Sequence, residues 1–325
     1  MWAARATARR LLAARAYATK VDIGALRRLR QLNPVPLGKA KEALLSSDND
    51  VDRALAWLES DAVAAGAQRA AKVRGRAARE GGVAVHVNGE RTAAAIVEVL
   101  CETDFVARNA AFVDLAAGIA RAAVRFAGRA GAEIDVGRLA AAAAAAAGAL
   151  ESRTVGEAVT EGIGRLGENI VLRRAAAVGA AGGAGADVTV GGYVHGAVAG
   201  SDGAAAAGKI GAVVAVRSAA RSAEHRAALG RLAARLAQQV VGFAPRFVTR
   251  AEWERAGSPG PETAALEAQE FLFGGGTVAE ALARLSRELA APVEVASFVR
   301  LERGEGIEKP PQPDFASEVR QQLQQ

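Results

Sequence analysis

The stretch Glu-Thr-Asp-Phe-Val-Ala-Arg-Asn at residues 102–109 lies where a strand pattern stops and a helix pattern starts. Before it, the apolar runs at residues 83–87 and 92–100 flank Asn88-Gly89, which predicts a β-hairpin whose two turn residues both have positive φ. After it, residues 112–126 place large apolar side chains at helical spacing. We therefore expect the Asp-Phe pair of this stretch to lie on a connection that two regular elements hold rigidly.

The same order of elements recurs later in the chain. Strand patterns near residues 192–198 and 210–216 precede a helix pattern at 221–241, and a further strand pattern covers 293–301. Between the two sets, residues 154–174 start as a helix and finish as a strand. The sequence therefore predicts an α+β fold with two related core units, each a small antiparallel sheet packed on helices. We place these units at residues 83–178 and 179–325, the second with a glycine-rich insert at 179–185 and a short C-terminal helix capped by Asp314.

Three short helices are predicted ahead of this core, in a domain at residues 21–61. Asp22 and Asp50 are placed to cap helices that start at Ile23 and Val51, and a middle helix starts near Leu37. The segment that follows, residues 62–82, is basic and poor in large apolar side chains, which is typical of a solvated helix face or a linker. We assign it as a basic linker.

Composition limits the classes of protein that this chain can be. Its 325 residues are 51% apolar, which suits a folded protein. No uncharged apolar run approaches the roughly 20 residues that a membrane helix needs. The single cysteine, Cys101, excludes an intramolecular disulfide framework, and the three histidines, His86, His195 and His225, have no metal-ligand spacing with it. We therefore expect no metal, no membrane partner and no catalytic constellation.

The formal charge of +6 is concentrated at the start of the chain. Residues 1–20 carry four arginines and one lysine without an acid, which leaves +1 for all the other residues. A nearly neutral body argues against nucleic acid as the primary partner. The segment is typical of an amphipathic transit peptide, so we expect a mitochondrial matrix location. A disordered basic arm is the alternative.

Residues 102–109 closely resemble the signature of the translation elongation factor Ts family, the guanine-nucleotide exchange factors of elongation factor Tu. Four more segments resemble the family in the same order, so that the resemblance covers roughly residues 22–320. They are residues 51–58 (VDRALAWL), 167–174 (GENIVLRR), 193–196 (YVHG) and 304–309 (GEGIEK). The resemblance implies that the first three helices form a ubiquitin-associated-like domain.

The resemblance also implies a function and its residues. The chain would be an exchange factor of the mitochondrial type, without covalent chemistry and without a cofactor. It would bind mitochondrial elongation factor Tu, disturb the Mg²⁺ and phosphate site of this GTPase and promote replacement of GDP by GTP. Contacts with the GTPase are implied for Thr103, Asp104, Phe105 and Val106, for Arg30 and Leu37 in the first domain, and for His195 in the second core unit. From the residues alone, Asp104 could instead be a helix N-cap and Phe105 a core residue.

Two other classes of function stay open at this point. Residues 203–209 place glycines and a lysine as in a phosphate-binding loop, which would fit an enzyme with a nucleotide cofactor. Ile210 then stands where a hydroxyl should hold Mg²⁺, and a strand is expected where such a loop needs a helix. A ubiquitin-type adaptor built on the first three helices is the other alternative.

Overall fold

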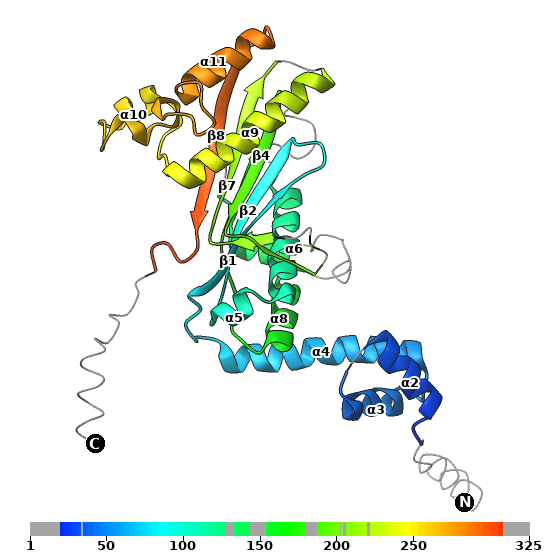
Figure 1. Cartoon of the computed structure of the whole chain (residues 1–325). Helices are drawn as coiled ribbons and strands as arrows, with labels where there is room; N and C mark the ends of the chain where they lie inside the picture. Colours follow the sequence, from blue (N-terminus) through cyan, green and yellow to red (C-terminus); the bar gives the residue numbers. More distant parts are fainter. Residues whose placement is uncertain are drawn as a thin grey trace, which may run out of the picture. The chain divides into compact units, whose positions relative to one another are not determined.

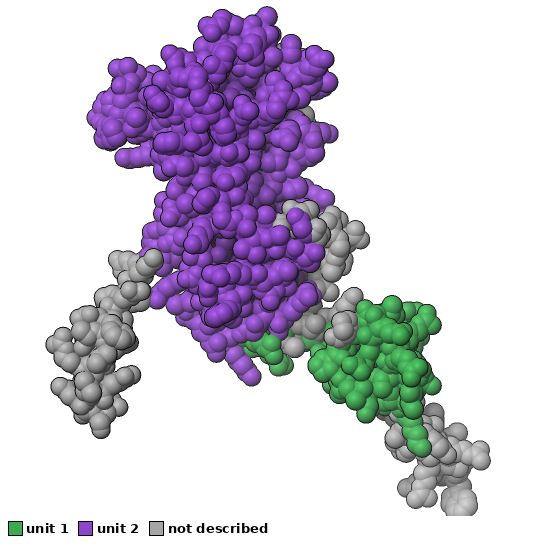
Figure 2. All heavy atoms as spheres, viewed as in Figure 1, with its two compact units in different colours: residues 1–69 green, residues 70–325 purple. Residues whose placement is uncertain are grey.

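The computed structural model of the chain describes residues 20–33, 35–127, 133–142, 154–179, 187–201, 203, 206–219 and 222–307. The chain divides into two compact units, unit 1 up to Arg69 and unit 2 from Ala70 onward (Figure 2). All but the last residue of the expected transit peptide lies outside the described residues. The same holds for the predicted C-terminal helix and for most of the glycine-rich insert.

Unit 1 contains three helices, as the sequence predicts. They are α2 (Ile23–Leu32), α3 (Leu37–Ser46) and the first part of α4 (Val51–Val73). The Asp22 carboxylate accepts a hydrogen bond from the backbone N–H of Ala25 at 2.6 Å, and Asp50 accepts one from Arg53 at 2.9 Å. Both predicted caps are therefore confirmed. A small core joins the three helices through Leu29, Ala40, Ala43, Leu44, Ala54 and Leu58.

Helix α4 is longer than predicted. It was expected to end within the domain at residues 21–61, but it continues to Val73, so that the first part of the expected linker is helical. Residues 60–73 are rich in alanine and contain no proline, and helix formation therefore meets no local obstacle. The buried side chain of Val73 belongs to the core of unit 2.

Unit 2 contains two antiparallel sheets. The first has the order β3-β2-β1-β6-β5. Its strands are β1 (Glu80–Val87), β2 (Ala93–Cys101), β3 (Val171–Gly179), β5 (Val198–Ala199) and β6 (Ala206–Gly208). The second has the order β4-β7-β8, with β4 (Val188–His195), β7 (Ile210–Ser218) and β8 (Val293–Glu302).

The two sheets pack face to face between two layers of helices. Val83 and Ile96 of the first sheet meet Val190, Val213 and Ala215 of the second. The other face of the first sheet is covered by a layer that includes α5 (Asp104–Ala107), α6 (Ala110–Phe126), α7 (Val136–Ala141) and α8 (Val155–Leu166). Because β2 is enclosed on both faces, all nine of its residues are buried.

The outer face of the second sheet is covered by α9 (Ala223–Phe243) and α11 (Val278–Glu288), and α9 crosses β4 and β7 in Figure 1. Gly191 on β4 permits this close approach, because a Cβ there would lie 2.4 Å from backbone atoms of Ala233 and Ala234. Between α9 and α11 the chain forms α10 (Arg250–Arg255) and the short helices η1 (Glu262–Ala264) and η2 (Leu266–Ala268).

The α+β class and the predicted strands and helices of the core are confirmed, but one turn is not. Neither Asn88 nor Gly89 has positive φ; Arg91 does, at 55°. The Asn88 side-chain oxygen accepts hydrogen bonds from the backbone N–H groups of Thr92 and Ala93. The connection is therefore a five-residue loop closed by a side chain, which replaces the predicted two-residue turn.

The predicted boundary at residue 179 stays a prediction, and one pairing crosses it. Strand β6 pairs with β1, with Val83 opposite Gly208. The short strands β5 and β6, which follow β4 in the chain, thus belong to the first sheet. This pairing brings the segment after His195 close to the start of α5.

Candidate functional site

Helix α5 presents the Asp-Phe pair at the surface. Thr103 is its N-cap, with Oγ1 accepting from the backbone N–H of Val106 at 3.4 Å. Ala107 is buried and Val106 packs partly against the core, whereas Phe105 is 83% exposed. The alternative in which Asp104 caps the helix and Phe105 fills the core is therefore wrong. A single helical turn anchors its inner side in the protein and points an aromatic ring outward.

A carboxylate from a distant part of the chain holds the start of α5. Glu168 Oε2 accepts hydrogen bonds from the backbone N–H groups of Glu102 at 3.1 Å and of Thr103 at 3.0 Å. Its Oε1 accepts from the Thr103 hydroxyl at 2.5 Å. Gly167, at φ +81°, ends α8 in a left-handed conformation that glycine adopts readily, and the chain turns there toward α5.

The contact is reciprocal. Glu102 Oε1 accepts from the backbone N–H of Asn169 at 2.7 Å, and the Asn169 amide donates to the carbonyl of Arg76 at 2.9 Å. The guanidinium of Arg76 lies 3.7 Å from Glu102. Side-chain hydrogen bonds therefore connect three segments here: residues 102–103, residues 167–169 and the segment after α4. These bonds take the place of strand pairing between the three described segments.

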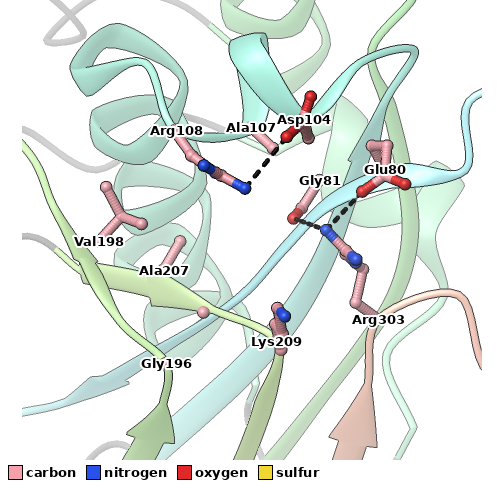
Figure 3. A pocket seen from close by; sticks show the side chains of 11 residues that line it. Glu80, Gly81, Asp104, Ala107, Arg108, Gly196, Val198, Ala207, Lys209 and Arg303 are labelled. Carbon is pink, nitrogen blue, oxygen red and sulfur yellow. Dashed lines mark hydrogen bonds and ion pairs between the residues drawn. The ribbon is translucent and has the colours of Figure 1, made fainter.

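A pocket of about 400 Å³ lies beside α5 (Figure 3). Small residues from β6 and the turn after β4 line it together with three cationic side chains, Arg108, Lys209 and Arg303. Arg108 pairs with Asp104 at 3.0 Å, and Arg303 pairs with Glu80 at 2.6 Å. Figure 3 shows these two pairs on opposite sides of the hollow, with Lys209 below them. The surface next to Phe105 is thus concave and carries charges of both signs.

His195 lies at the end of β4, one residue before Gly196, which lines this pocket. Its side chain is exposed, and its ring centroid is 6.5 Å from that of Tyr193. The predicted residues of the two core halves therefore flank one surface of unit 2.

Arg30 and Leu37 belong to unit 1, and they lie on one surface there. Together with Ile23, Leu26 and Arg27 they line a shallow hollow between α2 and the start of α3. Ile23 and Leu37 are both strongly exposed for apolar residues. This hollow is therefore a second candidate contact surface.

A buried ion cluster lies at the end of the interface between the sheets. Glu98 is fully buried, and it accepts hydrogen bonds from Arg173 at 2.8 Å, Arg174 at 2.5 Å and the backbone N–H of Gly304 at 2.7 Å. A β-bulge opposite Glu98 and Val99 lets the two consecutive arginines reach the same carboxylate. Arg174 also donates to the carbonyl of Glu302. The cluster connects β2 and β3 of one sheet with the end of β8 in the other.

Among the side chains whose pKa is shifted from its ordinary value are Arg174, Cys101 and His86. Burial lowers the pKa of Arg174, but the hydrogen bonds and negative charges of Glu98 and Glu305 together outweigh this effect, so the pKa is raised overall. Cys101 is fully buried, and this burial raises the pKa of its thiol to about 12. Burial, together with the nearby charges of Arg121 and Arg125, lowers the pKa of His86.

Other kinds of site find little support in the described part of the chain. Lys209 lies between β6 and β7, so the predicted strand follows it and a helix N-terminus does not. His, Cys, Asp and Glu do not gather there in threes that could hold a metal ion. Among the same residues, no helix has the length and apolar character needed to cross a bilayer.

Comparison with known proteins identifies the family. A family profile described as elongation factor TS matches residues 102–256. Elongation factor Ts of Rhizobium etli (strain CIAT 652) is 32% identical over 332 residues, covering 93% of this chain and 98% of that protein. Elongation factor Ts of Rhodospirillum rubrum is 33% identical, and the match covers 94% of this chain and 99% of that protein. Elongation factor Ts of Rhodopseudomonas palustris (strain BisB18) is 35% identical, and the match covers 90% of this chain and 94% of that protein. The chain belongs to the elongation factor Ts family. It is therefore a translation elongation factor.

Within this elongation factor Ts chain, the profile match begins at Glu102 and so includes α5, Glu168 and His195. The sequence patterns identified the exposed pair but not what supports it. Glu168 and Glu98 each contact partners more than 60 residues away, and a local pattern cannot reveal such pairs. The resemblance of residues 167–174 and 304–309 to the family was the available signal, because these segments supply the partners.

Proposed function

We propose that this protein is the guanine-nucleotide exchange factor of elongation factor Tu, acting without covalent chemistry and without a bound nucleotide. The carrying observation is that Phe105 is 83% exposed on a helical turn whose start is hydrogen-bonded to Glu168. A large apolar side chain in that position is costly in water and gains free energy when a partner covers it.

The chemistry of the pair suits a GTPase that holds its nucleotide through Mg²⁺ and phosphates. The ring of Phe105 would wedge between elements of the GTPase near the metal, and the Asp104 carboxylate would compete for groups that coordinate or surround it. Asp104 already has a cationic partner, Arg108, four residues on. Its charge is therefore balanced in the free protein and can be redistributed on binding.

Exchange then follows from linkage. If the factor weakens nucleotide binding by some ratio, nucleotide weakens binding of the factor by the same ratio. The complex of factor and empty GTPase is an intermediate, which GTP resolves by displacing the factor. The factor accelerates exchange of GDP for GTP without changing the final equilibrium between them.

Further contacts are proposed for the remaining candidate residues. Arg30 and Leu37, which line the hollow in unit 1, would bind the GTPase separately from α5. His195, beside the pocket of unit 2, would add a third contact. Thr103 and Val106, which are the N-cap and a partly buried anchor of α5, would contact the GTPase on either side of Asp104 and Phe105.

The test is release of a fluorescent GDP analogue from elongation factor Tu, measured with and without this protein. We expect acceleration with the wild type, and loss of most of it with the double variant Asp104→Ala, Phe105→Ala. Phe243→Ala is the matched control, because Phe243 is also exposed, at 51%, but lies at the end of α9. If folded wild-type protein does not accelerate release, the proposed function is wrong.

We also propose a mitochondrial matrix location, with residues 1–20 as transit peptide. Support comes from the five basic residues and the absence of acids in this segment. Import into isolated mitochondria should shorten the chain and protect it from added protease. Removal of residues 1–20 should abolish uptake; uptake of the truncated chain at the normal rate would contradict this location.

A further inference from the structure

Glu168 occupies a position from which it can control the exposed pair without touching the partner. Its carboxylate accepts the backbone N–H groups of Glu102 and Thr103 and the hydroxyl of Thr103. The Thr103 hydroxyl in turn accepts from the N–H of Val106. A continuous chain of hydrogen bonds thus runs from Glu168 into α5, one residue from Phe105.

Helix α5 needs such a support. It spans only four residues, and a single isolated helical turn is not stable in water. The exposed ring of Phe105 contributes little packing that could fix its own direction. Apart from the buried contacts of Ala107 and Val106, the orientation of the turn therefore depends on how its N-cap is held.

We propose that Glu168 is a positioning residue for nucleotide exchange: it fixes the N-cap of α5 and thereby the direction in which Phe105 projects. This inference rests on the proposed function. A carboxylate suits the role because both of its oxygens are acceptors, and here three donors converge on them. A further hydrogen bond strengthens this support: the backbone N–H of Asn169, next to Glu168, donates to the carboxylate of Glu102.

Two substitutions separate the charge from the hydrogen bonds. Glu168→Ala removes every acceptor and leaves two backbone N–H groups and one hydroxyl without their partner. Glu168→Gln keeps one oxygen for the two N–H groups, and its amide can donate to the Thr103 hydroxyl oxygen. We therefore expect Glu168→Ala to have the larger effect and Glu168→Gln to restore part of the wild-type behaviour.

The first measurement does not involve the GTPase. Amide hydrogen exchange of the backbone in residues 102–109 should be at least about tenfold faster in Glu168→Ala than in the wild type, while β2 and α6 keep their protection. Unchanged exchange rates in this segment would overturn the proposal, because the carboxylate would then not be what holds α5.

The second measurement is a double-mutant cycle in the nucleotide-release assay. Glu168→Ala should slow stimulated release about tenfold or more, and Glu168→Gln less. In a Phe105→Ala background the same substitution should have almost no further effect, because its consequence is transmitted through the ring. An equal further loss in that background would show that Glu168 acts in some other way, and the positioning role would be rejected.

A matched control excludes general destabilisation. Glu252 also accepts two backbone N–H groups, those of Val248 and Thr249, but at the start of α10. Glu252→Ala should leave stimulated release within about twofold of the wild type. Equal losses for Glu252→Ala and Glu168→Ala would overturn the proposal. If the wild type does not stimulate release, the exchange function fails, and the hydrogen-exchange result still decides whether Glu168 holds α5.

Discussion

Loss of the charge of Glu98 should destabilise unit 2 strongly. In Glu98→Gln the side chain keeps its shape, but the guanidinium groups of Arg173 and Arg174 lose their shared counter-charge. Both arginines are only about a quarter exposed, at 26% and 25%, and Glu98 itself is 0% exposed. Removal of one partner from a buried ion pair costs about 3–5 kcal/mol. Because water still reaches part of each guanidinium, we expect about 3 kcal/mol, at the lower end.

The single cysteine makes a selective assay possible. Cys101 is fully buried in β2, three residues after Glu98, so its labelling by a thiol reagent reports opening of unit 2 alone. Labelling is measured as a function of urea concentration. With a slope of about 3 kcal/mol per molar urea, a loss of 3 kcal/mol lowers the midpoint by about 1 M.

The control is an exposed ion pair in the same unit. Arg217 and Glu294 are 2.8 Å apart, and each side chain is 57% exposed. Such pairs contribute about 0–1 kcal/mol, so Glu294→Gln should hardly move the midpoint. Equal midpoint shifts for Glu98→Gln and Glu294→Gln would refute the argument from burial.

A second variant keeps the test valid if Glu98→Gln folds poorly. In Glu98→Gln with Arg173→Met, one of the two arginines that lose Glu98 is also removed, and the other, Arg174, keeps Glu305 at 3.1 Å. The combined loss of stability should be smaller than the sum of the two single losses, by about 0.5–3 kcal/mol. Strict additivity would mean that the charges do not interact in the folded protein.

Three further predictions concern buried or half-buried side chains. The pKa of Cys101 is about 12 against an ordinary 9.0, which lowers the thiolate fraction at pH 8 roughly 1000-fold. Cys101 should therefore react with iodoacetamide only after the protein unfolds, and rapid reaction of the folded protein would contradict this. Burial lowers the pKa of His86 below 6.5, so near that pH the unfolded chain binds more protons than the folded protein. The free energy of unfolding should therefore fall as the pH drops below about 6.5 toward the folded pKa. His86→Gln should remove this part of the pH dependence of the urea midpoint. Gln239 is fully buried, accepts a hydrogen bond from the N–H of Leu272 and donates one to the carbonyl of Glu270. Gln239→Ala should therefore lower the urea midpoint by an amount equivalent to about 2–3 kcal/mol. A loss below about 0.5 kcal/mol would mean that these hydrogen bonds do not stabilise the fold.

The sequence predicted those parts of the fold that depend on neighbouring residues. Asp22 and Asp50 cap helices as expected, because a cap is decided within four residues. The turn after β1 was predicted wrongly, because the Asn88 side chain closes the loop in place of a positive-φ backbone. The residues near Asn88 are compatible with a two-residue turn and with a five-residue loop. The pairing of the two strands sets the length of the loop and so decides between them.

Exposure of Phe105 could not be predicted from spacing. Its position in a helical turn fits a core residue as well as a surface residue. The ring points outward because Ala107 packs against the core and Glu168 holds the N-cap, and both contacts depend on the tertiary fold. The ion pairs of Glu98 join residues about 75 apart in the chain, and the bulge that brings both arginines to it depends on the pairing of β2 with β3. Such contacts depend on the register of the paired strands, which the sequence pattern alone did not predict.

The rigid support of α5 has a consequence for how exchange can work. A flexible segment that carried Phe105 would lose conformational entropy on entering the GTPase, and this loss would weaken binding. Glu168 and the N-cap of Thr103 order the segment during folding, so less entropy remains to be lost on binding. More of the free energy of covering Phe105 is then available to weaken the hold on the nucleotide. Under the proposed function, the hydrogen bonds behind α5 would set the size of the coupling, and the exposed ring would transmit it.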